Sequence, residues 1–304
     1  MSEVNPAARA TLLMIASTVC FAGMALTIRF AAHELHAFEI AFFRNFFGLA
    51  FALPLLLRTG TQVLRTRRMS LYLLRCVIGL SAMLTGFWSL VHMPLAEAIA
   101  LSYTTPLFVT IGAVLVLGEV VRIRRWTAVF VGFLGALVIL RPGIEQLSFP
   151  AMVALASAAL SASAAISIKF LSRTESPDAI VIYMVLIMTP LSLIPAIPVW
   201  TWPHGATWAW LAATGFLGTA GHVMLTRAYQ LGDVSALQPI NFLQLPIVAS
   251  LAWWLFNERV DQWTYLGAAI IFSSTLYIAH REAVLARKVT SARDTGKDGT
   301  SAHR

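Results

Sequence analysis

Long stretches without a charged residue constrain the fold of this 304-residue chain more than any other feature. An α-helix needs about 20 apolar residues, within a range of roughly 17–25, to cross the hydrocarbon core of a bilayer. Several stretches without Asp, Glu, Lys or Arg reach this length, and the longest has 48 residues. They include residues 10–28, 98–118, 146–168, 179–226, 234–257 and 262–280. The chain is therefore expected to lie in a membrane.

These stretches predict ten transmembrane helices. The 48-residue stretch is long enough for two helices joined by a turn at Pro203-His204-Gly205. Three weaker segments, which contain a charged residue or are short, complete the set: 40–57, 71–91 and 126–140. Only 12% of the residues are charged, against roughly 25% in soluble domains, and little chain remains for a soluble domain. The expected fold class is an all-α integral membrane protein.

The positions of the basic residues predict the orientation. With the amino terminus in the cytoplasm, 17 of the 22 Lys and Arg residues fall on the inner side and three on the outer side. By the positive-inside rule both termini then face the cytoplasm, and we expect a multi-pass protein of the bacterial inner membrane. The net charge of +8 follows the loops and so does not indicate a nucleic-acid partner. The polar segment 283–304 is expected to be a disordered tail.

The sequence repeats itself weakly at an offset of about 140 residues. The corresponding pairs include Arg29 with Lys169, Pro106 with Pro246 and, after a one-residue gap, Glu119 with Glu258. We therefore predict two halves, 1–143 and 144–282, with five helices each. Because five is odd, the second half must enter the membrane from the opposite face. Inverted repeats of this kind recur in secondary transporters.

The two halves carry related motifs around their fourth helices. The first half has Pro94-Leu95-Ala96-Glu97-Ala98, Pro106-Leu107 and Leu117-Gly118-Glu119, and the second has Asp233-Val234-Ser235-Ala236, Pro246-Ile247 and Phe256-Asn257-Glu258. In these motifs the chain resembles the drug/metabolite transporter superfamily, in particular its EamA-type members. The second copy departs from the pattern at Asn257, where the first has Gly118. The resemblance implies ten helices and export or exchange of metabolites, often amino acids.

Pro106 and Pro246 lie near the middle of their helices, where proline frees the carbonyl four residues earlier. Transporters place such interrupted helices at a substrate site near the bilayer midplane. The polar residues beside the two prolines are Ser102, Tyr103, Thr104, Thr105, Gln238, Asn241 and Gln244. A structural alternative is a kink whose Ser and Thr hydroxyls bond back to their own helix. As substrate-binding residues we expect Tyr103, Thr104, Gln238, Asn241 and Gln244.

Few ionisable residues fall at membrane depth. Arg44 either pairs with Glu39 or a helix end near the outer surface, or binds a substrate carboxylate. Arg75, near the cytoplasmic end of the third helix, is expected to snorkel. His222 is either a proton-linked switch or a neutral hydrogen-bonded side chain. Trp88 is a further candidate for the substrate site, because together with Tyr103 it could line an apolar pocket.

The sequence contains no Gly-rich phosphate loop, no His-Glu-x-x-His pair and no cluster of cysteines. We therefore expect no catalytic residues, cofactor or metal, and a small-molecule substrate and the lipid bilayer as partners. The predicted function is a secondary transporter that exports or exchanges a small metabolite. The first expectation is an aromatic or other apolar amino acid, as in exporters of the YddG type. A nucleoside, a vitamin or S-adenosylmethionine is the alternative, and a membrane-embedded enzyme or passive channel remains open.

Overall fold

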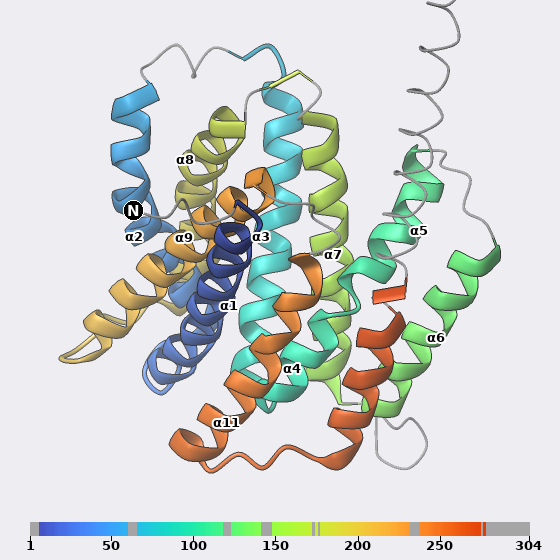
Figure 1. The fold of residues 1–304 in the computed structure, drawn as a ribbon. Helices are drawn as coiled ribbons and strands as arrows, with labels where there is room; N and C mark the ends of the chain where they lie inside the picture. The colour runs from blue at the N-terminus through green and yellow to red at the C-terminus, as the bar shows by residue number, and fades with distance from the viewer. Residues whose placement is uncertain are drawn as a thin grey trace, which may run out of the picture.

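The computed structural model describes residues 6–59, 66–117, 123–140, 148–171, 174–175, 177–231, 237–274 and 276–277. In these segments the regular structure is helical (Figure 1). The elements are α1 (Pro6–Ala31), α2 (Ala37–Thr59), α3 (Met69–His92), α4 (Leu95–Ser102), α5 (Thr105–Leu117), α6 (Ile123–Leu140), α7 (Phe149–Leu171), α8 (Pro177–Ala196), η2 (Ile197–Val199), α9 (Thr207–Leu231), η3 (Gln238–Leu243), α11 (Gln244–Phe256) and a last helix over 262–274.

These elements give the ten helical segments that the sequence predicts, if α4 with α5 and η3 with α11 each count as one segment. Within the described residues, five helical stretches are long and apolar enough to span a bilayer by themselves, namely 8–31, 69–92, 95–116, 149–168 and 182–199. The turn expected at 203–205 is present, because α8 and η2 end before it and α9 begins at Thr207. Gly205 takes a positive φ of 47°, which only glycine adopts without strain. The chain is an all-α, multi-pass membrane protein.

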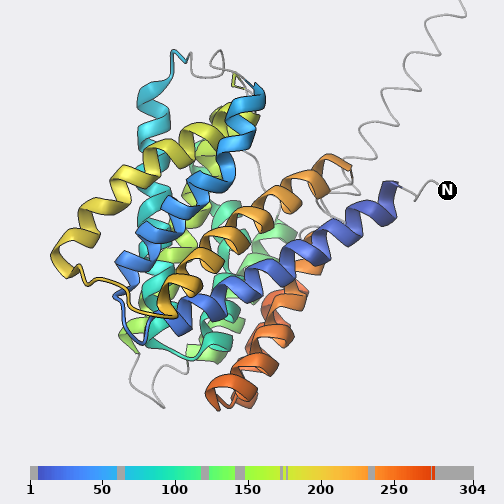
Figure 2. The ribbon, with the colours of Figure 1, turned by 90° about the vertical axis from the view of Figure 1, so that its left-hand side faces the viewer.

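Helices that are far apart in the sequence pack side by side. α1 lies along α9 and α3 lies along α7, and α1 and α9 are seen together in Figure 2. Glycines on α9 make the approach to α1 possible, since a Cβ atom on Gly218 would lie 2.9 Å from the sulfur of Met24 on α1. On α7, Ser157 donates a hydrogen bond to the Ala82 carbonyl of α3 at 2.8 Å. The small residues of these helices therefore serve close packing.

Two glycines bring the backbone of α6 close to that of the last helix. A Cβ atom on Gly135 would lie 2.8 Å from the Gly267 carbonyl oxygen, and one on Gly267 would lie 2.5 Å from the Gly135 carbonyl oxygen. Near this crossing the hydroxyl of Ser274 donates to the Ala128 carbonyl. Because backbone atoms meet here, neither glycine can gain a side chain without moving a helix.

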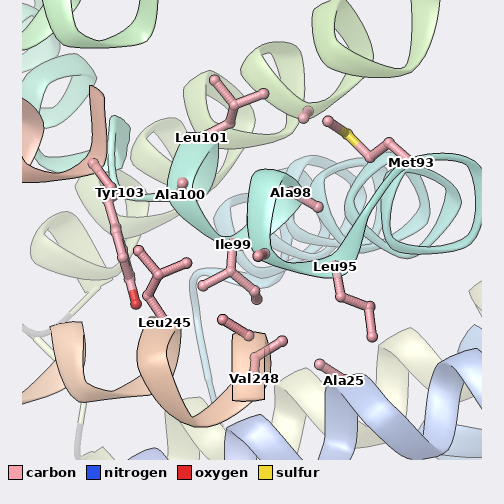
Figure 3. Packing of buried hydrophobic residues seen from close by; sticks show 14 of the residues in the cluster. Ala25, Met93, Leu95, Ala98, Ile99, Ala100, Leu101, Tyr103, Leu245 and Val248 are labelled. Atoms are coloured by element: carbon pink, nitrogen blue, oxygen red, sulfur yellow. The ribbon is translucent and has the colours of Figure 1, made fainter. Parts of the chain in front are cut away.

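The short helix α4 lies at the centre of the largest apolar core. Its buried residues are Leu95, Ala96, Ala98, Ile99, Ala100 and Leu101. Figure 3 shows Leu95 and Ile99 pointing toward Ala25 of α1 and toward Leu245 and Val248 of α11, whereas Leu101 points to the opposite side. Lipid is as apolar as this core, so in a membrane close packing rather than exclusion of water favours such a contact.

Candidate substrate site

The two proline-containing segments are interrupted, and they meet near their interruptions. α4 ends at Ser102 and α5 begins at Thr105, while in the second half η3 gives way to α11 at Gln244. The Tyr103 hydroxyl, from the first interruption, donates to the Asn241 carbonyl of η3 at 3.2 Å. The Tyr103 ring also packs on Phe242, with ring centroids 4.3 Å apart. The interrupted helices expected from Pro106 and Pro246 are thus present and in contact.

The hydroxyls beside Pro106 bond within their own segment. Ser102 donates to the Ile99 carbonyl, Thr104 to the Leu101 carbonyl and Thr105 to the Ser102 carbonyl, each at 2.7 Å. The Ser102 carbonyl is the one that Pro106 leaves without its usual helical donor. The structural alternative for these hydroxyls is therefore the observed one, and Thr104, though brought to the interruption, is fully buried.

The three amides beside Pro246 occupy different environments. Asn241 and Gln244 are half-buried, and the backbone N–H of Gln244 bonds to the Asn241 and Phe242 carbonyls. Asn241 takes part in a further interaction. Gln238 begins η3, and its side chain lies outside the described part of the structure. The junction of η3 and α11 thus brings Asn241 and Gln244 close to Tyr103.

Arg44 lies on α2 against α9 and is not paired with Glu39. Its guanidinium donates to the Asn45 side-chain oxygen at 2.9 Å, and a Cβ atom on Gly218 would lie 3.1 Å from its Nε. Glu39 instead accepts from the Thr201 backbone N–H at 2.6 Å. The expected pairing of Arg44 with Glu39 is therefore wrong, because Glu39 holds the loop before α9.

Arg75 does not snorkel, contrary to expectation. It is only 8% exposed, and its Nη2 lies 3.4 Å from the sulfur of Met184 on α8. Its guanidinium bends along its own helix over Gly79, where a Cβ atom would lie 2.0 Å from Nη1. Its position seven residues into α3 suggested an interfacial side chain. The glycine one turn further along is the sequence feature that could have indicated otherwise.

His222 shares a region with the two arginines, whereas Trp88 does not contact them. His222 lies on the exposed part of α9 and meets the Phe21 ring edge to face, with centroids 5.0 Å apart. It is close enough to Arg44 and Arg75 for their charges to act on it. Trp88 stacks on His92 at 3.9 Å, at the end of α3. The predicted site residues thus form three groups. Tyr103 lies with Asn241 and Gln244, Arg44 lies with His222, and Trp88 lies apart from both.

A cavity of about 660 Å³ opens where α1 and α11 end. Its lining includes Arg29, His33, Trp254, Asn257 and Glu258. Asn257 has a left-handed backbone with φ of 54°. Asn tolerates this conformation better than most other residues with a side chain, so the departure from glycine in the second motif is sterically conservative.

Helices interrupted at membrane depth, meeting across the sequence, define an integral membrane protein of the transporter class. The model of the EamA-like transporter family matches residues 8–141 and, a second time, residues 148–279. The chain belongs to the EamA-like transporter family. Proteins of this family are transporters and not enzymes.

Similar proteins carry the names of several transported solutes. A riboflavin transporter of Vibrio cholerae is 31% identical over 95% of this chain and 98% of its own length. An S-adenosylmethionine uptake transporter of Rickettsia prowazekii is 32% identical over 84% of this chain and 86% of its own. A pseudopaline exporter of Pseudomonas aeruginosa is 30% identical over 86% and 92%. These similarities support a transporter of small metabolites.

One solved crystal structure shares the fold, with a TM-score of 0.64 at 20% identity. The similarity covers 92% of this chain and 98% of the solved one.

Proposed function

We propose that this protein is a secondary transporter of a vitamin or of S-adenosylmethionine, working by alternating access. The observation that favours a carrier is the contact between the two interrupted helices, made by the Tyr103 hydroxyl and the Asn241 carbonyl. A carrier needs a joint that both halves can move around, and such joints in transporters lie beside the substrate. The substrate-contacting residues of this proposal are Tyr103, Asn241 and Gln244, with Arg44 and His222 on the α9 side.

The proposal includes an inverted repeat with halves 1–143 and 144–282. In that arrangement α7 corresponds to α1 and α9 to α3. The contact of α1 with α9 then has its equivalent in the contact of α7 with α3, and both contacts are extensive. The contacts of α4 with α11 and of α6 with the last helix would lie on the two-fold axis. The repeated match to the family model supports the same division.

The names of the relatives favour a vitamin or S-adenosylmethionine over the amino acid first expected from the sequence. Riboflavin and S-adenosylmethionine are named for proteins similar to nearly the whole chain. The relatives include uptake transporters and an exporter, so the direction of transport is left out of the proposal. We place the protein in the inner membrane with both termini in the cytoplasm, on the 17 to 3 distribution of loop charges.

The experiment uses purified protein in liposomes. Riboflavin and S-adenosylmethionine are each tested for saturable uptake and for acceleration by the same solute inside the vesicle. A carrier shows both effects, whereas a passive channel shows flux that rises in proportion to concentration without trans-stimulation. If neither solute is transported, the substrate proposal is wrong. Flux without trans-stimulation would refute the carrier mechanism.

A further inference from the structure

Among the described residues, no carboxylate is paired with either of two arginines at membrane depth, Arg44 and Arg75. Arg75 is 8% exposed, and its Nε and Nη1 atoms have no hydrogen-bond partner. Arg44 donates a hydrogen bond to the side-chain oxygen of Asn45, which is neutral. The Nδ2 atom of Asn45, a residue only 2% exposed, is also without a partner. Arg75 and Asn45 thus have hydrogen-bond donors to spare, and Arg44 lies beside Asn45.

These side chains come from two helices, and two further helices face them. Arg44 and Asn45 belong to α2 and Arg75 to α3, and the facing helices are α8 and α9. On α8, Thr189 bonds to the backbone carbonyl of Asn45 and Met184 contacts Arg75. In the proposed repeat these helices are the second and third of each half, so the donors gather between the halves.

The carboxylates that the structure describes nearby are engaged elsewhere. Glu39 accepts hydrogen bonds from Thr201, Glu175 accepts from Thr66 and Tyr72, and Glu258 is paired with Arg29. The other titratable groups near the arginines are His222 and the buried thiol of Cys76, and neither is a carboxylate. Within the described residues the site therefore has a positive charge without a counter-ion.

An uncompensated charge in the interior of a membrane protein is costly, and such residues usually mark a substrate or ion pathway. Arginine also binds carboxylate and phosphate through two parallel hydrogen bonds. Gly79 and Gly218 leave room for the two guanidinium groups, because a side chain at either position would crowd them. The arrangement resembles a site that is complete only when an anion enters it.

We infer that Arg44, Arg75 and Asn45 form a subsite for an oxyanion, a carboxylate or phosphate, of the transported solute. This inference deepens the proposed function and rests on it for the rest of the solute. A solute with such a group supplies the missing counter-charge, and the three side chains supply its donors. The anionic member of a matched pair of solutes should therefore bind better than the neutral member.

The test compares two solute pairs that differ in one group. Riboflavin and its 5′-phosphate differ by a phosphate, and S-adenosylmethionine and its decarboxylated form differ by a carboxylate. Affinities are measured by calorimetry on the purified full-length protein and on Arg44→Gln, Arg75→Gln and Arg75→Lys. Arg68→Gln, at the exposed start of α3, is the control.

We expect at least one anionic member to bind wild type tenfold or more tightly than its partner. This preference should fall below about threefold in both Gln variants and persist in Arg75→Lys and Arg68→Gln. Ligand-free Arg75→Gln should melt at the same or a higher temperature than wild type, because it loses an unpaired buried charge. A purely structural arginine would instead give a lower melting temperature without a change in preference.

Equal binding of both members of each pair by wild type, or no binding of either anionic member, overturns the subsite. This result needs no variant, so a poorly folded variant cannot obscure it. Counterflow of the four solutes in liposomes tests the proposed function separately. Anion binding that depends on the arginines without any counterflow would refute the transporter and support the subsite. Counterflow of riboflavin, together with variants that bind the anionic solutes as wild type does, would support the transporter and refute the subsite.

Discussion

The guanidinium of Arg29, near the end of α1, is ion-paired with the carboxylate of Glu258, 229 residues further along the chain. The same arginine donates to the Leu90 carbonyl of α3 at 2.8 Å. The second oxygen of Glu258 accepts from the Leu95 backbone N–H, at the first turn of α4, at 2.9 Å. One ion pair thus joins the ends of α1, α3, α4 and α11 at the cavity there.

Removing the Glu258 carboxylate should loosen this end of the bundle. Glu258→Gln keeps an acceptor for Leu95 but loses the charge, and we expect a loss of about 1 kcal/mol in unfolding free energy. Glu258→Leu also leaves the Leu95 N–H without its partner, and we expect about 1–3 kcal/mol more. Thermal unfolding in detergent measures both. Arg259→Gln is the matched control, since Arg259 is exposed beside Glu258. If the Leu and Gln variants unfold alike, the bond to Leu95 contributes nothing.

Replacing Gly135 by alanine should destabilise the crossing of α6 with the last helix. The new Cβ would meet the Gly267 carbonyl at 2.8 Å, and backbone atoms cannot move aside as a side chain can. We expect a loss of about 1–3 kcal/mol. Gly23→Ala is the control, because its Cβ would meet only the flexible end of Leu217 at 3.2 Å. A tolerated Gly135→Ala would show that the helices cross more loosely than described.

Asn241→Leu and Gln244→Leu should reduce transport while the protein stays folded. The bond from Tyr103 goes to the backbone of Asn241 and survives the substitution. A membrane hydrogen bond is worth roughly 0.6 kcal/mol, whereas an amide that contacts substrate is worth about 1–3 kcal/mol, or fivefold to a hundredfold in affinity. Substrate affinity and melting temperature are measured in parallel, with Leu243→Met as control. Unchanged transport in both, or a loss that follows unfolding, would place the site elsewhere.

The contact between the turn after α1 and the turn before α9 should weaken in acid. Hydrogen bonds from Thr207 and His204 hold the pKa of the Glu34 carboxyl below its usual range. A carboxyl with a lowered folded pKa stabilises the fold fully above its unfolded pKa, near 4.3, and loses this contribution as the pH falls through the folded value. The stability difference between wild type and Glu34→Gln should therefore be constant above about pH 5 and shrink as the pH falls below the unfolded pKa. A difference that stays constant down to about pH 2 would contradict this.

Reporter fusions test the orientation. A reporter after Arg304 should read cytoplasmic and one inserted in the loop 144–148 should read periplasmic, because the loop charges orient the chain with both termini inside. The segment 141–147 lies outside the described residues. The same readout from both fusions would refute the ten-helix inverted arrangement.

The sequence predicted the interrupted helices but not their surroundings. Pro106 and Pro246 located both interruptions, because proline removes a helical hydrogen bond wherever it stands. The sequence also indicates, as an alternative to substrate binding, that the hydroxyls of Ser102 and Thr105 bond within their own segment, and the structure shows these bonds. The contact between Tyr103 and Asn241 depends on how two distant helices cross, which no local pattern encodes.

The arginines show the same limit. Arg44 was expected inside the bundle because a charge avoids lipid, and it does lie against α9. Its expected partner Glu39 instead accepts a hydrogen bond from Thr201, which lies 162 residues after Glu39 in the sequence. Arg75 was expected at the interface, but the space over Gly79 and the sulfur of Met184 hold it inside.

The sequence by itself determined the membrane class, the ten helices and the turn at Gly205. Each follows from a local rule, since every uncharged stretch of about 20 residues must satisfy its own backbone in lipid. Only the tertiary structure decided which charges find partners, as Arg29 does in Glu258 and Arg44 does not in Glu39. Lipid does not drive particular helices together, so the choice of neighbours comes from close packing at small residues such as Gly135, Gly215 and Gly267, summed over the whole bundle.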